Sequence, residues 1–210
     1  MNEPETLLAR RRRLVRTDLA RIAISLFAER GFEAVTVDDI AAAAGISART
    51  FFRYFATKDE VVLDYDRLLR ARLLDALDRR PPAEGPVTAL RNAYLSTSHV
   101  PVDDRARIVQ IGHILLAAPA LRELAQAVRA AGDEPLVERV AARMGLDPRH
   151  DVAPRTVVAA MAAVASREWQ AWVDDGGDGD PAERIANALA LVERGLDALE
   201  DVKQPRTRTA

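Results

Sequence analysis

Two short helical segments joined by a tight turn that contains a glycine constrain this chain more than any other part of its sequence. Thr36 is expected to begin the first segment, because its hydroxyl can cap the helix and Asp39 can reach back to the Thr36 backbone. Gly45 ends that helix, and only Ile46 separates it from Ser47, the expected cap of the second segment. The pattern predicts a helix-turn-helix, in which a tight turn sets the angle between two short helices.

The rest of the chain is also predicted to be helical. In the first helix, apolar residues recur at three- and four-residue steps, and Gly31 follows its end. No alternating apolar and polar run of the strand type occurs. We therefore expect an all-α protein of about nine helices. They are expected at about residues 11–30, 36–44, 47–55, 58–80, 87–98, 104–117, 119–143, 154–174 and 181–199.

The charge is divided unevenly along the chain. Residues 1–58 hold ten Lys and Arg against seven Asp and Glu, a balance of +3, whereas residues 59–210 hold twenty against twenty-five, a balance of −5. The positive end suggests an anionic partner for the N-terminal part. We expect an N-terminal arm and helix-turn-helix domain at 1–57, a helical domain at 58–202 and a disordered tail at 203–210.

Composition excludes several kinds of chemistry. The chain has no cysteine, so disulfides, thiolate chemistry and cysteine-ligated zinc are excluded, and its three histidines have no zinc-binding spacing. No apolar run approaches the roughly 18 residues of a membrane span, and the N-terminus lacks the apolar stretch of a secretory signal. A cytoplasmic protein without metal or cofactor is expected. Of the 30 basic residues 28 are arginine, which is typical of a GC-rich bacterial genome.

The second segment of the helix-turn-helix has two distinct faces. Phe51 and Phe55 are four residues apart and are expected to point inward together. All five phenylalanines lie between residues 27 and 55, where large rings can fill the core of a small three-helix unit. The adjacent outer face carries two guanidinium groups, a hydroxyl and a phenol, from Arg49, Arg53, Thr50 and Tyr54.

This part of the chain resembles the DNA-binding domain of TetR-family transcriptional regulators. The resemblance rests on the stretches FAERGFEAVTVDDIAAAAGIS and ARTFFRYFATK, and it covers about residues 14–65. It implies that Thr36 and Lys58 contact phosphates from the starts of their helices. It further implies that Thr50 and Tyr54 contact phosphates or bases. Phe52 stands where many members have tyrosine, so that hydroxyl contact is lost and the ring is expected to be partly core.

The resemblance also implies which residues read the bases. Ala48, Arg49 and Arg53 occupy or flank the base-reading face, and arginine is the commonest reader of guanine, so a G·C-containing half-site is expected. Lysine at the start of a helix opposes the helix dipole, which favours a partner for Lys58. The arginine run at 10–13 is either a solvated face or an extension that binds phosphates or enters the minor groove. The DNA-binding candidates are Thr36, Ser47, Ala48, Arg49, Thr50, Arg53, Tyr54, Lys58, Arg10, Arg11, Arg12 and Arg13.

The later helices are implied to form a ligand-binding and dimerisation domain. Residues 100–198 weakly resemble the ligand domains of actinobacterial regulators that bind acyl-CoA-like molecules, which suggests a long, largely apolar effector. The alternative for each candidate is a core residue whose polar group satisfies a buried hydrogen bond. The ligand-binding candidates are Tyr65, Asn92, Tyr94, His113, Met161, Glu168 and Trp169.

The family likeness implies a homodimeric repressor of a near-palindromic operator, released by its effector. The helices at about 154–174 and 181–199 are expected to pair with those of a second copy, through apolar stripes that include Val164, Leu189, Leu191 and Leu196. Two alternatives remain open: a helical adaptor without a ligand, and a small helical enzyme. No metal cluster, phosphate loop or nucleophile motif supports the enzyme.

Overall fold

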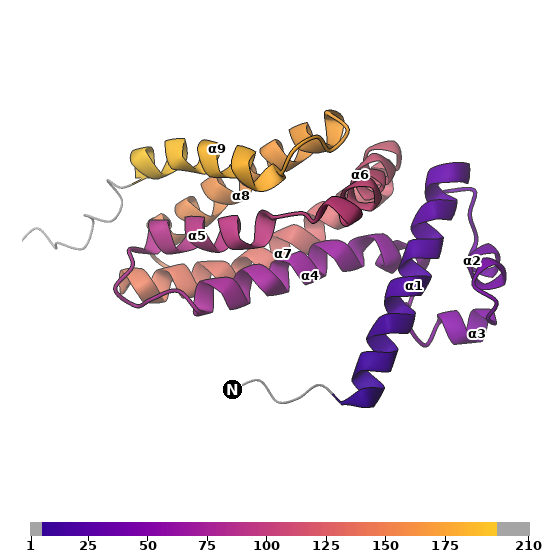
Figure 1. Ribbon diagram of the computed structural model, residues 1–210. Coiled ribbons are helices and arrows are strands. Elements are labelled where there is room, and N and C mark those ends of the chain that lie inside the picture. The colour runs from indigo at the N-terminus through magenta and orange to yellow at the C-terminus, as the bar shows by residue number, and fades with distance from the viewer. Residues whose placement is uncertain (1–5, 197–210) are drawn as a thin grey trace, which may run out of the picture. The chain divides into compact units, whose positions relative to one another are not determined.

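The computed structural model of the protein describes residues 6–196 of the 210-residue chain. That part contains nine helices and no strand, so the predicted all-α fold is confirmed (Figure 1). No single helix in it is long and apolar enough to cross a membrane; α6 and α7 reach that length and composition only together, across a bend of 111°. The helices are α1 (Leu7–Arg30), α2 (Val37–Ala43), α3 (Ala48–Phe51), α4 (Lys58–Asp78), α5 (Pro86–Ser98), α6 (Val102–Ala117), α7 (Pro119–Met144), α8 (Val152–Asp174) and α9 (Pro181–Leu196).

The chain packs as two compact units. Of the described residues, the first unit comprises 6–66 and 106–126, and the second comprises 67–105 and 127–196. Helices α4, α6 and α7 each contribute residues to both units. The predicted domain boundary at the start of α4 stays a sequence-based prediction, and the predicted tail at 203–210 lies outside the described residues.

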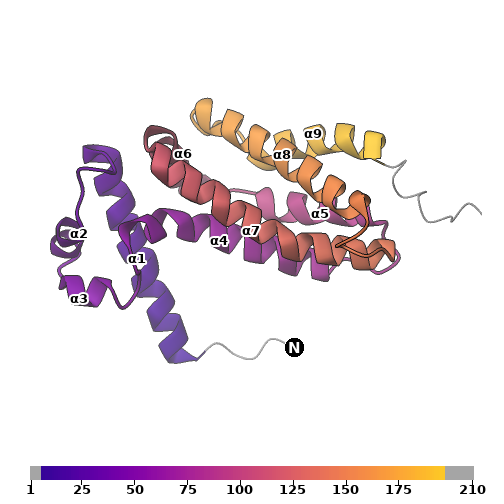
Figure 2. The same ribbon diagram turned by 180° about the vertical axis from the view of Figure 1, so that it is seen from behind.

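In the first unit, α1 begins earlier than the apolar periodicity predicts. Thr6 caps the helix, because its hydroxyl oxygen accepts a hydrogen bond from the Ala9 N–H at 3.2 Å. Gly31, at a φ of +85°, ends the helix at the predicted place. The arginine run therefore lies within regular helix, and α2 and α3 lie together on one side of α1 (Figures 1 and 2).

Phenylalanine rings fill the core of this unit, as the sequence predicts. Phe27 and Phe32 meet edge to face with ring centroids 4.9 Å apart, and Phe51 and Phe55 lie 5.7 Å apart. All four of these rings are buried. Phe52 is the exception: its side chain is 55% exposed, so the expectation that it belongs partly to the core is wrong. It directly follows the buried Phe51 on a helical turn and therefore points to a different side.

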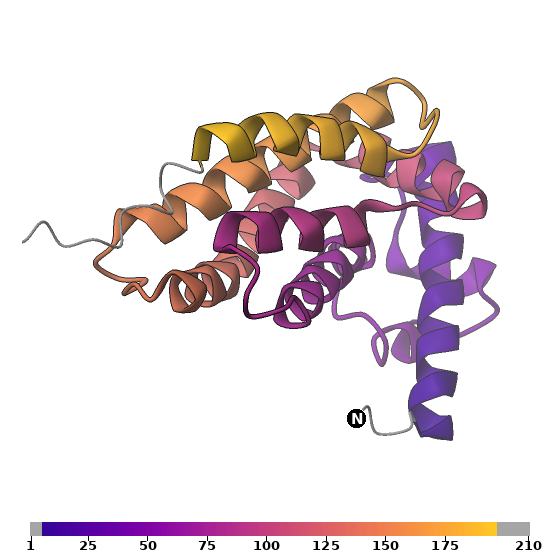
Figure 3. The same cartoon turned by 60° about the vertical axis from the view of Figure 1, so that its left-hand side comes forward.

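In the second unit, α9 packs against α5 and α8 (Figure 3). The Glu193 carboxylate of α9 accepts a hydrogen bond from the Thr88 hydroxyl at 2.6 Å and pairs with the Arg91 guanidinium at 2.7 Å, both on α5. Leu189 lies fully buried in this core, so its expected place on a dimer stripe is wrong. The apolar face of α9 is largely used within one chain. The side chain of Leu196 lies outside the described residues.

Candidate nucleic-acid interface

The start of α2 is fixed by the predicted reciprocal cap. The Asp39 N–H donates to the Thr36 hydroxyl oxygen at 3.2 Å, and the Thr36 N–H donates to the Asp39 carboxylate at 2.8 Å. The Thr36 hydroxyl also donates to that carboxylate at 2.5 Å. These hydrogen bonds from Thr36 lower the pKa of Asp39 below its ordinary value. Thr36 is therefore an exposed cap residue whose hydroxyl is already engaged.

The turn between α2 and α3 is closed by backbone hydrogen bonds. Gly45 has a φ of +66°, a conformation that side chains disfavour, and the next residue's N–H reaches back to the Ala41 carbonyl at 2.9 Å. Ser47 then caps α3, since its hydroxyl oxygen accepts from the Thr50 N–H at 3.2 Å and lies 3.0 Å from the Thr50 hydroxyl. Both predicted DNA contacts, Ser47 and Thr50, thus also hold the start of α3.

Helix α3 is shorter than predicted but presents the predicted outer face. After Phe51 the chain continues in turns, in which the Tyr54 N–H donates to the Phe51 carbonyl at 2.8 Å. Arg49 and Arg53 are exposed, and the Arg53 guanidinium lies 5.9 Å from the centre of the half-buried Tyr54 ring. Ala48 is half-buried at the start of the same helix. The structure therefore gathers the expected polar groups around one short helix.

Arg16 holds the end of this segment, a role that the sequence reasoning missed. Its guanidinium donates to the Asp64 carboxylate at 2.6 and 3.0 Å, to the Glu60 carboxylate at 3.1 Å and to the Tyr54 carbonyl. It also lies 4.2 Å from the centre of the Phe55 ring. The hydrogen bond to Asp64 raises the pKa of Arg16 further above its ordinary value. Arg16 therefore connects α1, the end of α3 and α4.

A sequence signal for Arg16 exists. It precedes Leu19 by three residues and Ala23 by seven, so it lies on the apolar stripe of α1. A charged side chain on a buried helix face requires a partner. The sequence does not identify the partners of Arg16, because one is the backbone carbonyl of Tyr54 and the two carboxylates belong to a later helix.

Lys58 has a partner within the chain. Its ammonium donates to the backbone carbonyls of Phe32 at 2.8 Å, Val35 at 3.0 Å and Glu33 at 3.4 Å. It also lies 4.5 Å from the centre of the Phe32 ring. The sequence predicts that this lysine needs a partner, and the segment between α1 and α2 supplies one. Its predicted contact with a DNA phosphate stays a prediction.

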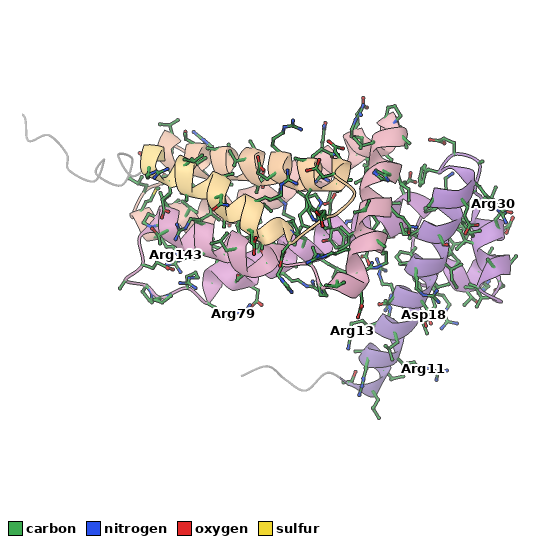
Figure 4. All side chains as sticks on the ribbon, turned by 45° about the horizontal axis from the view of Figure 1, so that its top comes forward. Arg11, Arg13, Asp18, Arg30, Arg79 and Arg143 are labelled. Atoms are coloured by element: carbon green, nitrogen blue, oxygen red, sulfur yellow. The ribbon has the colours of Figure 1, made fainter. Side chains whose placement is uncertain are left out.

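The arginine run contributes to a groove on the first unit. The groove has a volume of about 540 Å³ and is lined by Leu8, Arg11, Arg12 and Val15 of α1 and by Arg53 and Tyr54 after α3. At 3.6 residues per turn, Arg10 and Arg13 lie on the opposite face of α1. Figure 4 shows Arg11 and Arg13 leaving the helix on different sides.

The ligand-binding candidates are divided between the two units, and their role in ligand binding stays a prediction. Tyr65 and the exposed His113 belong to the first unit, whereas the other five belong to the second. The Asn92 amide donates to the Glu84 carboxylate at 2.5 Å, so its polar group already makes a hydrogen bond within the chain. Met161 is fully buried, and the half-buried Trp169 packs on the core with its ring 5.3 Å from that of Trp172. Glu168 is half-buried. No group of side chains among the described residues could hold a metal ion.

We expect Lys58→Met to lower the free energy of unfolding by about 1–3 kcal/mol, because the backbone carbonyls of Phe32 and Val35 lose a charged donor. Chemical denaturation without DNA measures this. Arg49→Met removes an exposed cation and should change the free energy by less than about 0.5 kcal/mol. Equal stability of the two variants would show that the carbonyl contacts contribute nothing.

Comparison with known proteins agrees with this geometry. Residues 21–65 match the family model of bacterial regulatory proteins of the tetR family, and residues 84–197 match that of the MftR C-terminal domain. The chain is 33% identical to the transcriptional regulator MftR of Mycobacterium tuberculosis over 198 residues, covering 93% of this chain and 98% of MftR. It is 35% identical to the HTH-type transcriptional regulator TcmR of Streptomyces glaucescens over 174 residues, covering 78% and 76%.

Solved structures show the same relationship. The crystal structure of Thermus thermophilus FadR, a TetR-family repressor in complex with lauroyl-CoA, aligns with a TM-score of 0.53 and 25% identity, covering 93% of this chain and 98% of FadR. The named relatives are transcriptional regulators. The chain therefore belongs to the TetR family and is a DNA-binding transcriptional regulator.

Proposed function

We propose that the protein is a homodimeric repressor that leaves a near-palindromic operator when it binds a small, largely apolar effector. The observation that carries operator reading is the outer face of α3. Arg49 is exposed there and has no hydrogen bond or ion pair to another residue of the described chain. Because neighbouring caps and Arg16 hold the helix, this guanidinium is presented from a fixed base, as specific readout requires.

The remaining contacts follow from the same placement. Ala48 beside Arg49 permits close approach to a base edge. Thr36, Ser47, Thr50 and Tyr54 lie around α2 and α3 and would contact phosphates. Lys58 would join them by exchanging its carbonyl partners for a phosphate oxygen. Phosphate contacts of this kind set the register on the duplex and carry no sequence information.

Site selection from a random duplex pool should return one near-palindromic motif with half-sites about one helical turn, roughly 34–36 Å, apart. Arg49→Ala should then cost about 1–3 kcal/mol on the selected site and leave binding to random duplex unchanged, since it removes a base contact. Fluorescence anisotropy at constant salt measures both affinities. An equal loss of affinity for the selected and the random duplex would show that Arg49 contacts a phosphate. Recovery of no motif would favour the adaptor.

Dimerisation is proposed through α8 and α9. On α8, Thr156, Ala159, Ala163 and Ser166 form an exposed, uncharged row at steps of three and four residues. On α9, Leu191 is 65% exposed although it is large and apolar. Small side chains allow two helices to approach closely, and the exposed leucine supplies apolar area to bury. These observations replace Leu189 as the support for this interface, while Val164 is partly buried against the core.

Leu191→Glu and Ala163→Glu should each convert the dimer to a species of 23.0 kDa, because either change buries an unpaired carboxylate in the interface. Sedimentation velocity measures the mass. Val102→Glu places the same charge on an exposed apolar residue of α6 and should leave the dimer intact. Three variants that behave alike would contradict this interface.

An effector site is favoured by a polar cluster in the second unit. Tyr94 of α5 is buried in the core, and no hydrogen bond of regular geometry reaches its hydroxyl from the described residues, although the Arg70 guanidinium lies close to it. Burial raises the pKa of Tyr94 to about 12, so the hydroxyl stays protonated and able to donate. An unpaired buried hydroxyl costs about 1–3 kcal/mol, a penalty that a ligand acceptor would remove.

The chemistry beside Tyr94 favours a neutral polar group on an apolar molecule. The Arg70 guanidinium of α4 donates to the Asp133 carboxylate of α7 at 2.6 Å, so the nearby charges balance. Burial raises the pKa of Asp133, an effect that the Arg70 charge opposes. A thioester carbonyl would accept a hydrogen bond from the Tyr94 hydroxyl, and an acyl chain would match the apolar character of the surrounding leucines and valines. FadR, the relative bound to lauroyl-CoA, makes that compound the first probe.

Tyr94→Phe should weaken lauroyl-CoA binding about tenfold, because it removes the donor to the thioester oxygen. Isothermal calorimetry measures the affinity. The variant without ligand should be as stable as the parent or more so, since it removes an unsatisfied hydroxyl. Tyr54→Phe, the same change after α3 in the first unit, should leave the affinity unchanged. Equal affinities for all three proteins would exclude Tyr94 from the effector site.

A further inference from the structure

The groove on the first unit combines positive charge with an apolar floor. Three of its six lining residues, Arg11, Arg12 and Arg53, carry guanidinium groups, and none carries a carboxylate. Leu8, which is 80% exposed, and Val15 add apolar surface between them. Three like charges around one hollow repel each other unless an anion lies among them. The lining therefore fits a ligand that is anionic at one end and apolar beside it.

The walls of the groove are formed before any ligand binds. One wall is regular helix from Leu7 onward. The other wall contains Tyr54, whose carbonyl is held by Arg16 from the same α1 helix. The Arg12 guanidinium also lies 3.5 Å from the Arg53 carbonyl oxygen, across the hollow. Binding would therefore require little ordering of the backbone.

The position of the groove indicates which anion it takes. Its second wall is the end of the α3 segment, and Arg53 stands beside the face that carries Arg49. A duplex read by Arg49 brings its own sugar–phosphate backbone next to that wall. A phosphodiester supplies the anion, and the deoxyribose supplies an apolar surface for Leu8 and Val15.

We propose that this groove binds one backbone phosphate of the operator, held by Arg11, Arg12 and Arg53. The inference rests on the proposed operator binding and refines it. The N-terminal turns of α1 then form a rigid part of the interface and not an arm inserted into the minor groove. Arg53 becomes a phosphate contact, which leaves base reading to Arg49. Arg10 and Arg13, on the other face of α1, take no part in this site.

The first test compares charge removal on the two faces of α1. Arg12→Gln should lower the slope of log affinity against log salt by about one and weaken the selected operator and random duplex by the same factor. Arg53→Gln should do the same. Arg10→Gln removes the same charge from the opposite face and should change the slope much less. Equal slopes for Arg10→Gln and Arg12→Gln would show that the arginines at 10–13 act only as diffuse positive charge. That result would refute the proposed phosphate site.

A second pair of variants tests the floor without removing an arginine. Leu8→Glu places a carboxylate among the three guanidinium groups and should weaken binding more than tenfold, since it neutralises guanidinium charge and repels the phosphate. Leu14→Glu adds the same charge to another exposed leucine outside the lining and should have a smaller effect. Thermal unfolding of each variant should match the parent, because both leucines are exposed. Equal losses would contradict a defined site.

Modified operators identify the group that is bound. Replacing single phosphates by neutral methylphosphonates should reveal one position per half-site that weakens the parent several-fold and weakens Arg12→Gln by a smaller factor, because only Arg11 and Arg53 then remain to lose their contact. Replacing guanine by inosine removes the minor-groove amino group. If Arg12→Gln suppresses an inosine effect and no phosphate effect, the arginines read the minor groove and the proposal is wrong. A parent that binds no operator would refute the proposed function, whereas a parent that binds with unchanged groove variants would refute the groove alone.

Discussion

The guanidinium of Arg16 is the interaction on which the DNA-binding unit depends most. The α3 helix has only four residues, Ala48–Phe51, and a helix of that length is not stable without tertiary contacts. Its start is held by the Ser47 cap, but its end runs into turns. Arg16 binds the Tyr54 carbonyl there and joins it to two carboxylates of α4. The end of the segment that carries Arg49 is therefore held by a residue that lies on another helix.

Cations in the first unit divide into two groups with different roles. Arg16 and Lys58 direct their charge inward, onto carbonyl oxygens and carboxylates of the same unit. Arg11, Arg49 and Arg53 remain on the surface. Only part of the positive charge counted over residues 1–58 is therefore available on the surface to a duplex. An internal cation fixes geometry, whereas an external one contributes to affinity in proportion to the counterions it displaces.

Much of this unit was predictable because its signals are local. The Thr36 and Ser47 caps, the glycine turns and the buried Phe51 and Phe55 each follow from residues within a few positions of each other. What the sequence left open depends on partners that are distant along the chain. Leu189 was expected on an outer stripe, yet α5 and α8 cover it. Periodicity identifies the apolar face of a helix, but it does not say whether that face meets the same chain or a second copy.

Helix α4 connects the two kinds of binding that the chain is proposed to perform. Lys58 at its start holds the segment before α2, and Arg70 further along pairs with Asp133 beside the Tyr94 hydroxyl. Both contacts are polar and partly buried, so each has a preferred arrangement that a ligand can shift. In the proposed mechanism, an effector that binds beside Tyr94 would change DNA affinity only if it binds one form of the protein more tightly than the other. In the proposed mechanism, a ligand that binds the DNA-bound and the free form of the protein equally well would occupy its site without releasing DNA.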